Sequence, residues 1–144
     1  MQGKAFLDTN VLVYLFTDKE PIKAKQALSV ALTSRIVIST QVLQELANVL
    51  TKKYHQTIEQ VVATLEVCMK AGELHTNTHQ TIVKALSIKK SHKFSFYDSL
   101  IVAAAIDSGC QTLFSEDLQH EQQIIDGLRV VNPFLAEIDG LIID

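Results

Sequence analysis

The residues with the clearest potential for chemistry are four acids spread along the sequence: Asp8, Glu45, Asp98 and Asp117. Asp8 is the most conspicuous of them, because it follows three apolar residues and precedes the apolar run Val11–Phe16. A carboxylate set between apolar runs destabilises the fold unless something pairs with it. We therefore asked what could pair with Asp8 and whether the other three acids take part.

No Lys or Arg stands next to any of the four acids in sequence, although distant lysines could still neutralise them in the fold. The other natural partner is a hard divalent cation, because Mg²⁺ and Mn²⁺ prefer carboxylate and water ligands. Such an ion polarises a phosphoryl oxygen and lowers the pKa of a water molecule, which suits phosphodiester hydrolysis. The acids thus indicate metal-dependent chemistry on phosphate esters.

The elements that must position these acids alternate between short apolar runs and helical patterns. Strands are predicted at Lys4–Leu7, Arg35–Ser39, Thr112–Ser115 and Leu128–Val131, with a shorter edge strand around Glu73–Thr76. Helices are predicted at Ile22–Leu32, Gln41–Tyr54, Ile58–Ala71, Gln80–Lys90 and Tyr97–Ser108. This alternation predicts an α/β fold, a three-layer α/β/α sandwich around a mainly parallel sheet of four to five strands. We find no repeat or linker and expect one domain over residues 1–144.

The predicted sheet brings the acids together. Ligands of open α/β sheets bind beyond the carboxyl ends of the strands. Asp8 follows the first predicted strand, and Asp117 lies just beyond the third. Glu45 falls early in the helix after the second strand, and Asp98 falls in the first turn of the helix that leads into the third. We therefore expect the four side chains to converge on one rim.

Each acid alone also has a structural interpretation. Asp8 could cap a helix that starts near Asn10, Glu45 could border the core face of its helix, and Asp117 could end its strand in a turn. Asp98 has the strongest alternative, because Ser95 and Asp98 match a capping box. For any single acid the structural interpretation is the better one. Four of them at one sheet edge would repel one another, which favours a metal site.

Four segments resemble the motifs of the PIN domain family, in the order and at the spacing of that family: "FLDTNVLVYLF", "STQVLQELANVL", "FSFYDSLIVAAA" and "TLFSEDLQ". The resemblance covers nearly the whole chain. It implies that Asp8, Glu45, Asp98 and Asp117 hold Mg²⁺ or Mn²⁺, with Asn10 and Ser115 at the polar positions that orient them. Glu116 is a neighbouring acid in the last motif, so its contribution stays open.

The resemblance also implies a function. Members of this family cleave single-stranded RNA, and small bacterial chains of this kind are mostly VapC-like toxins of type II toxin–antitoxin pairs. It implies an endoribonuclease that uses metal-activated water, acts as a homodimer and is paired with a VapB-like antitoxin. One alternative function is a metal-dependent phosphatase or phosphotransferase. A nucleophilic Asp of the haloacid-dehalogenase type, however, is followed two residues later by a second Asp, and this position is Asn10 here. The other alternative is a non-catalytic module whose acidic rim binds a basic peptide.

The remaining composition limits the partners. The net charge of −3 gives no general attraction for RNA, so contacts must be local. Lys89, Lys90 and Lys93 form a basic cluster before the Asp98 motif, either as a solvated helix end or as a phosphate contact. No run approaches the roughly 18 apolar residues of a membrane span. We expect a cytoplasmic protein whose two cysteines, Cys68 and Cys110, are reduced core thiols, with one disulfide between them as the alternative.

Overall fold

The computed structural model describes residues 3–118 and 124–135 of the chain. Its strands are β1 (Lys4–Leu7), β2 (Arg35–Ser39), β3 (Glu73–His75), β4 (Thr112–Phe114), β5 (Ile124–Ile125) and β6 (Leu128–Val131). They form one sheet in the order β3-β2-β1-β4-β6-β5. All neighbouring pairs are parallel except β5 with β6. The predicted mainly parallel sheet is confirmed, with β1 in its interior between β2 and β4.

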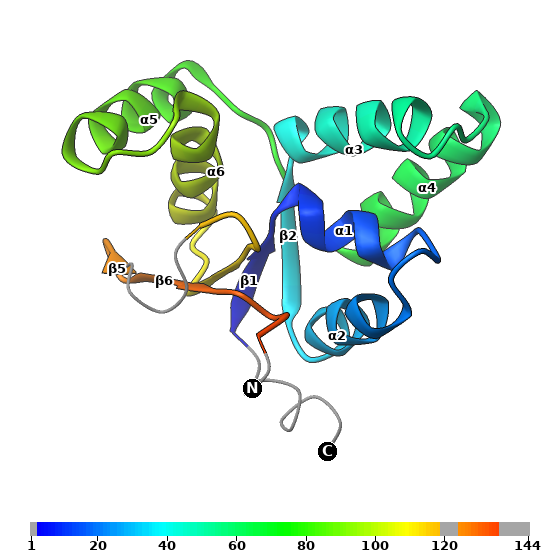
Figure 1. The fold of residues 1–144 in the computed structure, drawn as a ribbon. Coiled ribbons are helices and arrows are strands. Elements are labelled where there is room, and N and C mark those ends of the chain that lie inside the picture. Colours follow the sequence, from blue (N-terminus) through cyan, green and yellow to red (C-terminus); the bar gives the residue numbers. More distant parts are fainter. Residues whose placement is uncertain (1–2, 119–123, 136–144) are drawn as a thin grey trace.

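Helices cover both faces of the sheet. They are α1 (Thr9–Leu15), α2 (Pro21–Leu32), α3 (Thr40–Lys52), α4 (Ile58–Ala71), α5 (His79–Ser91) and α6 (Phe96–Asp107). Figure 1 shows α1 to α4 on one side of the strands and α5 with α6 on the other. The predicted α/β/α sandwich is therefore confirmed. None of the helices in the described residues is long and apolar enough to span a membrane.

The core explains why the elements form where they do. Ala5, Phe6 and Leu7 are all buried, as expected of an interior parallel strand covered by helices on both faces. Helix α6 buries every residue from Ser99 to Ala105, so it is apolar around its whole circumference rather than along one stripe. Cys68 and Cys110 are free and buried, as predicted.

The predicted strands need one correction. Strand β5 is not among them, although Asp126-Gly127 carries a hairpin signal: both residues have positive φ, 50° and 81°, and join β5 to β6. The glycines that follow α6 and α4 differ in conformation. Gly109, after α6, has a positive φ of 77°, whereas Gly72, after α4, has an extended backbone. A Cβ at Gly72 would lie 2.8 Å from the carbonyl oxygen of Ile36, so this glycine permits close approach to β2.

Candidate active site

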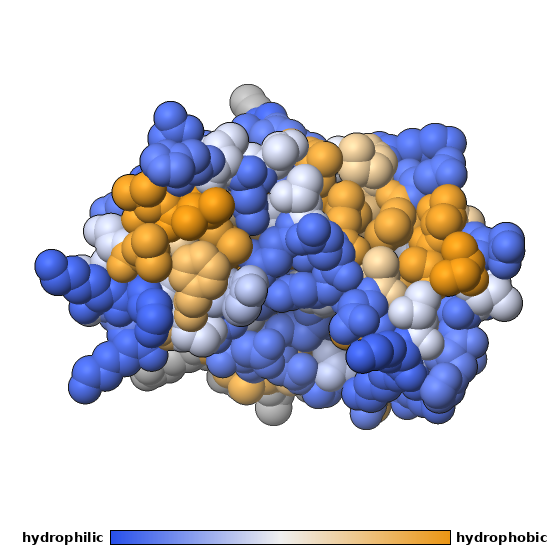
Figure 2. Space-filling model, turned by 90° about the horizontal axis from the view of Figure 1, so that it is seen from above, coloured by the Kyte–Doolittle hydropathy of each residue, from blue (hydrophilic) through white to orange (hydrophobic). Residues whose placement is uncertain are grey.

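A cleft of about 510 Å³ lies at the carboxyl ends of β1 and β4. All four predicted acids line it, together with Thr9, Asn10, Val13, Tyr14, Gln41, Asn48, Val49, Lys53, Tyr54, Ile101 and Glu116. Figure 2 looks onto this edge of the molecule and shows a hydrophilic area between two hydrophobic patches. The site therefore lies where parallel sheets place their ligands.

Asp8 is buried at the base of the cleft, with 5% of its surface exposed. It follows β1 directly and caps α1, because its Oδ1 accepts a hydrogen bond of 2.7 Å from Thr9 N. Its Oδ2 accepts one of 2.8 Å from Ser115 Oγ. Burial raises the pKa of Asp8 to about 7. The hydrogen bonds from Ser115 and Thr9 lower this pKa, whereas the charges of Asp117 and Glu45 raise it further. Asp8 is thus both a helix cap and a carboxylate that is costly to ionise.

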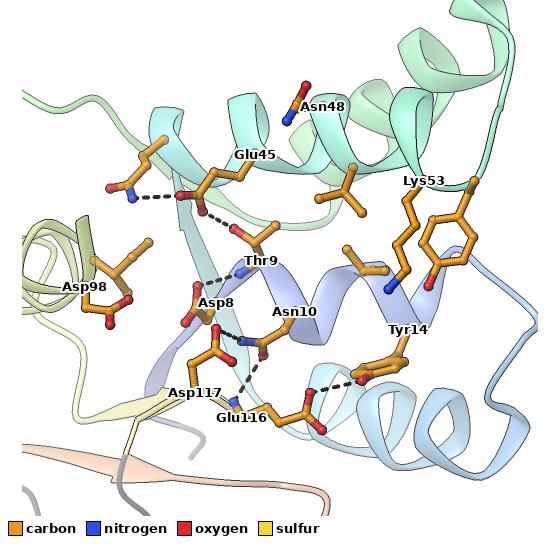
Figure 3. Close-up of a pocket in the computed structure, with 15 residues that line it drawn as sticks. Asp8, Thr9, Asn10, Tyr14, Glu45, Asn48, Lys53, Asp98, Glu116 and Asp117 are labelled. Atoms are coloured by element: carbon orange, nitrogen blue, oxygen red, sulfur yellow. Dashed lines mark hydrogen bonds between the residues drawn. The ribbon is translucent and has the colours of Figure 1, made fainter. Parts of the chain in front are cut away.

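Glu45 is held by two residues from different elements. Its Oε1 accepts a hydrogen bond of 2.5 Å from Thr9 Oγ1, and its Oε2 accepts one of 3.0 Å from Gln41 Nε2. Gln41 Nε2 also donates to the carbonyl oxygen of Tyr97, 3.2 Å away at the start of α6. These bonds tie α1, α3 and α6 together around the carboxylate, as Figure 3 shows for Thr9 and Glu45.

Asp117 is oriented by the two polar residues that the sequence indicated. Asn10 Nδ2 donates to Asp117 Oδ2 over 3.0 Å, and Asn10 Oδ1 accepts from Glu116 N over 3.1 Å. Ser115 Oγ accepts from Asp117 N over 3.1 Å while donating to Asp8. Ser115 is fully buried, so this hydroxyl links the ends of β1 and β4. Asn10 and Ser115 therefore hold the last motif against the first.

Asp98 lies in the first turn of α6, half-buried on the opposite wall of the cleft. Of the two hydrogen bonds of a capping box, the structure contains the one from Asp98 N to Ser95 Oγ, at 3.1 Å. Burial raises the pKa of Asp98, and the charges of Asp117 and Glu45 raise it further, while the interaction of its carboxyl group with the Ser95 side chain lowers it. The backbone of Asp98 serves the cap, and its carboxyl group faces the other acids.

Glu116 has a different environment from Asp117. Its carboxylate forms an ion pair with Lys23 of α2 and accepts a hydrogen bond of 2.9 Å from the Tyr14 hydroxyl. The Lys23 ammonium also lies 4.9 Å from the centre of the Tyr14 ring. These contacts neutralise Glu116, so it ties the last motif to α1 and α2.

Within residues 3–118 and 124–135, the four acids have no positively charged ion-pair partner. None of the described lysines or arginines forms an ion pair with Asp8, Glu45, Asp98 or Asp117. Their charges instead raise the pKa values of Asp8 and Asp98. This donor set of carboxylate oxygens fits a hard divalent cation, which would remove the repulsion.

The carboxylates are not gathered around a single point. Within the described part of the chain, no three Asp, Glu, His or Cys side chains stand close enough to hold an ion as they are. Asp8, Glu45 and Asp117 each point to their own hydrogen-bond donors, which lowers the mutual repulsion. Side-chain rotation would be needed to bring them onto one ion, and the four-acid metal site stays a prediction.

Several residues of the cleft were missed by sequence reasoning. Gln41 precedes Glu45 by four residues on one helix, a spacing that could have identified it as a neighbour. Thr9, and Lys23 beside the cleft, carried no comparable signal. The predicted contacts Lys89, Lys90 and Lys93 lie outside the lining of this cleft, whereas Lys53 is part of it. A role of the three lysines in binding RNA stays a prediction.

Comparison with solved structures finds the same architecture in bacterial toxins. A toxin–antitoxin complex from Klebsiella pneumoniae matches with a TM-score of 0.68 and 26% identity, over 90% of this chain and 98% of that one. VapC20 of Mycobacterium tuberculosis, a toxin that cleaves the sarcin–ricin loop, matches with a TM-score of 0.64 and 20% identity, over 78% and 91%. VapBC2 of Rickettsia felis, bound to a promoter DNA fragment, matches with a TM-score of 0.65 and 20% identity, over 88% of this chain and 96% of that one. Comparison with curated proteins gives no significant match.

The family model described as the PIN domain matches residues 5–123. This range begins in β1 and contains all four acids of the cleft, as well as Asn10 and Ser115. The matched range is well over half of the chain, and the solved toxins share its fold. The predicted resemblance is therefore confirmed, and the chain belongs to the PIN domain family.

Proposed function

We propose that this protein is a divalent-metal-dependent endoribonuclease that cuts single-stranded RNA in the cytoplasm. The observation that carries the proposal is the convergence of Asp8, Glu45, Asp98 and Asp117 on one cleft without a cationic partner among the described residues. Membership of the PIN domain family supports it, and one solved structure of similar fold is a toxin that cleaves the sarcin–ricin loop.

The four acids would hold Mg²⁺ or Mn²⁺. When bound, such an ion supplies positive charge that polarises a phosphoryl oxygen and lowers the pKa of a water molecule. Thr9 N and Ser115 Oγ each occupy one lone pair of Asp8, which leaves acceptor capacity on both oxygens for a cation. Thr9 and Gln41 do the same for Glu45. Asn10 orients Asp117, so the chain's own hydrogen bonds hold three of the four carboxylates in the cleft.

Metal dependence is the direct test. The protein should cut a labelled single-stranded RNA with Mg²⁺ or Mn²⁺, stop in EDTA, and gain no activity from Ca²⁺, whose longer bonds and looser geometry misplace the attacking water. It should leave p-nitrophenyl phosphate intact, which a phosphatase would hydrolyse. A binding module with an acidic rim should cut neither substrate.

The control is Asp98→Asn protein purified in parallel, which reveals any contaminating nuclease. Full cleavage in EDTA by the wild type, with no cleavage by the variant preparation, would contradict the four-acid metal site, because the activity would then belong to the protein and need no metal.

A role as the toxin of a type II pair, with a VapB-like antitoxin, is also proposed. The Klebsiella pneumoniae structure is a toxin–antitoxin complex, and that chain is matched over almost its full length. The sequence of the adjacent upstream gene would test this: a short chain with a DNA-binding head and a disordered tail is expected there.

We propose that two copies of the chain associate. Ile82, Val83 and Leu86 of α5 and Tyr97 of α6 are exposed, and Figure 2 shows a hydrophobic patch on this side of the molecule. Exposed patches of this kind are typical of association surfaces. Light scattering at micromolar concentration should give the mass of a dimer for the wild type and of a monomer for Leu86→Glu. A monomeric wild type would contradict the proposal.

A further inference from the structure

The cleft has a second end with a different character from the acidic one. Beyond Glu45, its wall is formed by Asn48, Val49, Lys53 and Tyr54 at the end of α3, with Tyr14 of α1 opposite. Figure 3 shows Lys53 extending from α3 toward Tyr14, well away from Asp98. The cleft therefore runs from four carboxylates to a lysine flanked by aromatic rings.

Lys53 differs from Lys23, which also lies near the cleft, in having no acidic partner in the described part of the chain. Lys23 forms an ion pair with Glu116, whereas Lys53 forms no ion pair with any described acid. Its ammonium lies 5.6 Å from the centre of the Tyr54 ring. A contact with a ring face leaves the hydrogen-bond donors of the ammonium available for a ligand.

The distance between the two ends separates them into different subsites. Lys53 follows Glu45 by eight residues, which corresponds to roughly 12 Å along the helix axis. One phosphate group cannot contact both ends. A polyanionic strand that places one phosphodiester at the acids would present a neighbouring phosphate to Lys53.

We propose that Lys53 binds a backbone phosphate of the RNA strand next to the phosphodiester that is cut, with Tyr54 as the aromatic wall of this subsite. The inference rests on the proposed function and deepens it. The acids repel a polyanion, so a free cation in the same cleft adds binding energy where the net charge of the protein supplies none. Lys53 contacts the strand away from the reacting atoms, which makes it a substrate-binding residue and leaves the chemical step to the acids.

The experiment compares Lys53→Met with Lys52→Met, because the two lysines are adjacent and both exposed, but Lys52 lies outside the cleft lining. Binding of a fluorescent single-stranded RNA decamer is measured by anisotropy with Ca²⁺ in place of Mg²⁺, over a series of salt concentrations. Lys53→Met should weaken binding about tenfold. The slope of log K against log salt should become shallower by about 0.7. Lys52→Met should resemble the wild type, and Lys53→Arg should retain most of the affinity.

Cleavage with Mg²⁺ adds a second readout. On the decamer, Lys53→Met should raise KM about tenfold and leave kcat within twofold, because the contact is present before and during reaction. On a dinucleoside monophosphate, which has no neighbouring phosphate, the variant and the wild type should be equal. Equal salt slopes for Lys53→Met and Lys52→Met would overturn the inference, and so would an equal loss on both substrates.

The outcomes separate this inference from the nuclease proposal. A wild type that binds the decamer through Lys53 without cutting it would overturn the nuclease proposal alone. A wild type that cuts the decamer with no contribution from Lys53 would overturn the subsite alone. A wild type that neither binds nor cuts RNA would overturn both.

Discussion

Asp98→Asn should lower the rate of RNA cleavage by at least about 100-fold without destabilising the metal-free protein. The hydrogen bond that caps α6 runs from the backbone N of Asp98 to Ser95 Oγ, and an Asn at this position keeps it. The carboxylate itself is desolvated and faces the charges of Asp117 and Glu45, which raise its pKa. Removal of that charge relieves repulsion, so the variant should melt in EDTA at the same temperature as the wild type or higher.

With Mn²⁺ added, the wild type should instead melt at a higher temperature than Asp98→Asn. A ligand stabilises the folded state more the more tightly it binds that state, and the variant has lost one carboxylate ligand. The measurement is a pair of melting curves, in EDTA and in Mn²⁺, together with one cleavage assay.

Asp107→Asn is the matched control, because Asp107 lies on the same helix, outside the cleft, and pairs with Lys84 at 3.5 Å. It should lower stability by at most about 1 kcal/mol and leave cleavage unchanged. If Asp98→Asn melts lower in EDTA and still cuts RNA at the wild-type rate, Asp98 is a helix cap and has no part in catalysis.

Asp8→Asn should remove a large pH dependence of stability from the metal-free protein. The pKa of Asp8 is about 7 in the folded protein, against an ordinary value of 3.8. Between these values the folded protein keeps a proton that the unfolded chain has lost. This proton stabilises the fold fully below pH 3.8, and the stabilisation is lost as the pH rises through 7.

The shift of roughly three units corresponds to about 4 kcal/mol in the free energy of unfolding. Urea denaturation in EDTA at pH 4 and pH 8 should therefore show a loss of stability in the wild type that exceeds the loss in Asp8→Asn by about this amount. Titrating groups that do not interact with Asp8 cancel, since both proteins contain them. The Asn side chain can still accept from Thr9 N and donate to Ser115 Oγ, so the local hydrogen bonds survive.

Bound metal should abolish the difference in pH-dependent stability between the wild type and Asp8→Asn. A bound divalent cation favours the ionised carboxylate, so Mn²⁺ should flatten the pH dependence of the wild type and bind more tightly at higher pH. Parallel stability curves for wild type and Asp8→Asn in EDTA would show that Asp8 ionises at its ordinary pKa, and would remove the argument that a cation is needed at the base of the cleft.

Sequence patterns were enough to predict the parallel strands, the position of the four acids and the bounds of most elements to within two residues. Strands β1, β2 and β6 and helix α4 begin and end where the apolar pattern predicted them. These elements follow from local properties, because apolar spacing and capping residues act over a few neighbouring positions. The convergence of the acids followed as well, since the carboxyl ends of parallel strands share one edge.

Asn10 and Ser115 were expected as partners of the acids, but the other partners depend on tertiary packing. Glu116 and Asp117 are adjacent acids, yet Glu116 pairs with Lys23 from α2 while Asp117 binds Asn10 from α1. Both acids line the cleft, and nothing in their spacing predicts which of them forms the ion pair, because the choice depends on how α1 and α2 pack beside the end of β4.

Lys53 is a second residue whose place in the cleft depends on tertiary packing. At about 100° per residue, Lys52 lies roughly 20° from Glu45 on the helical wheel and Lys53 roughly 80° away. The sequence would therefore have favoured Lys52, but Lys53 lines the cleft. The cleft opens on the side of α3 where α1 places Tyr14, and α3 ends at Lys52, where the regular wheel no longer applies. Which side of a helix faces a site depends on the element packed against it, and that element is distant in sequence.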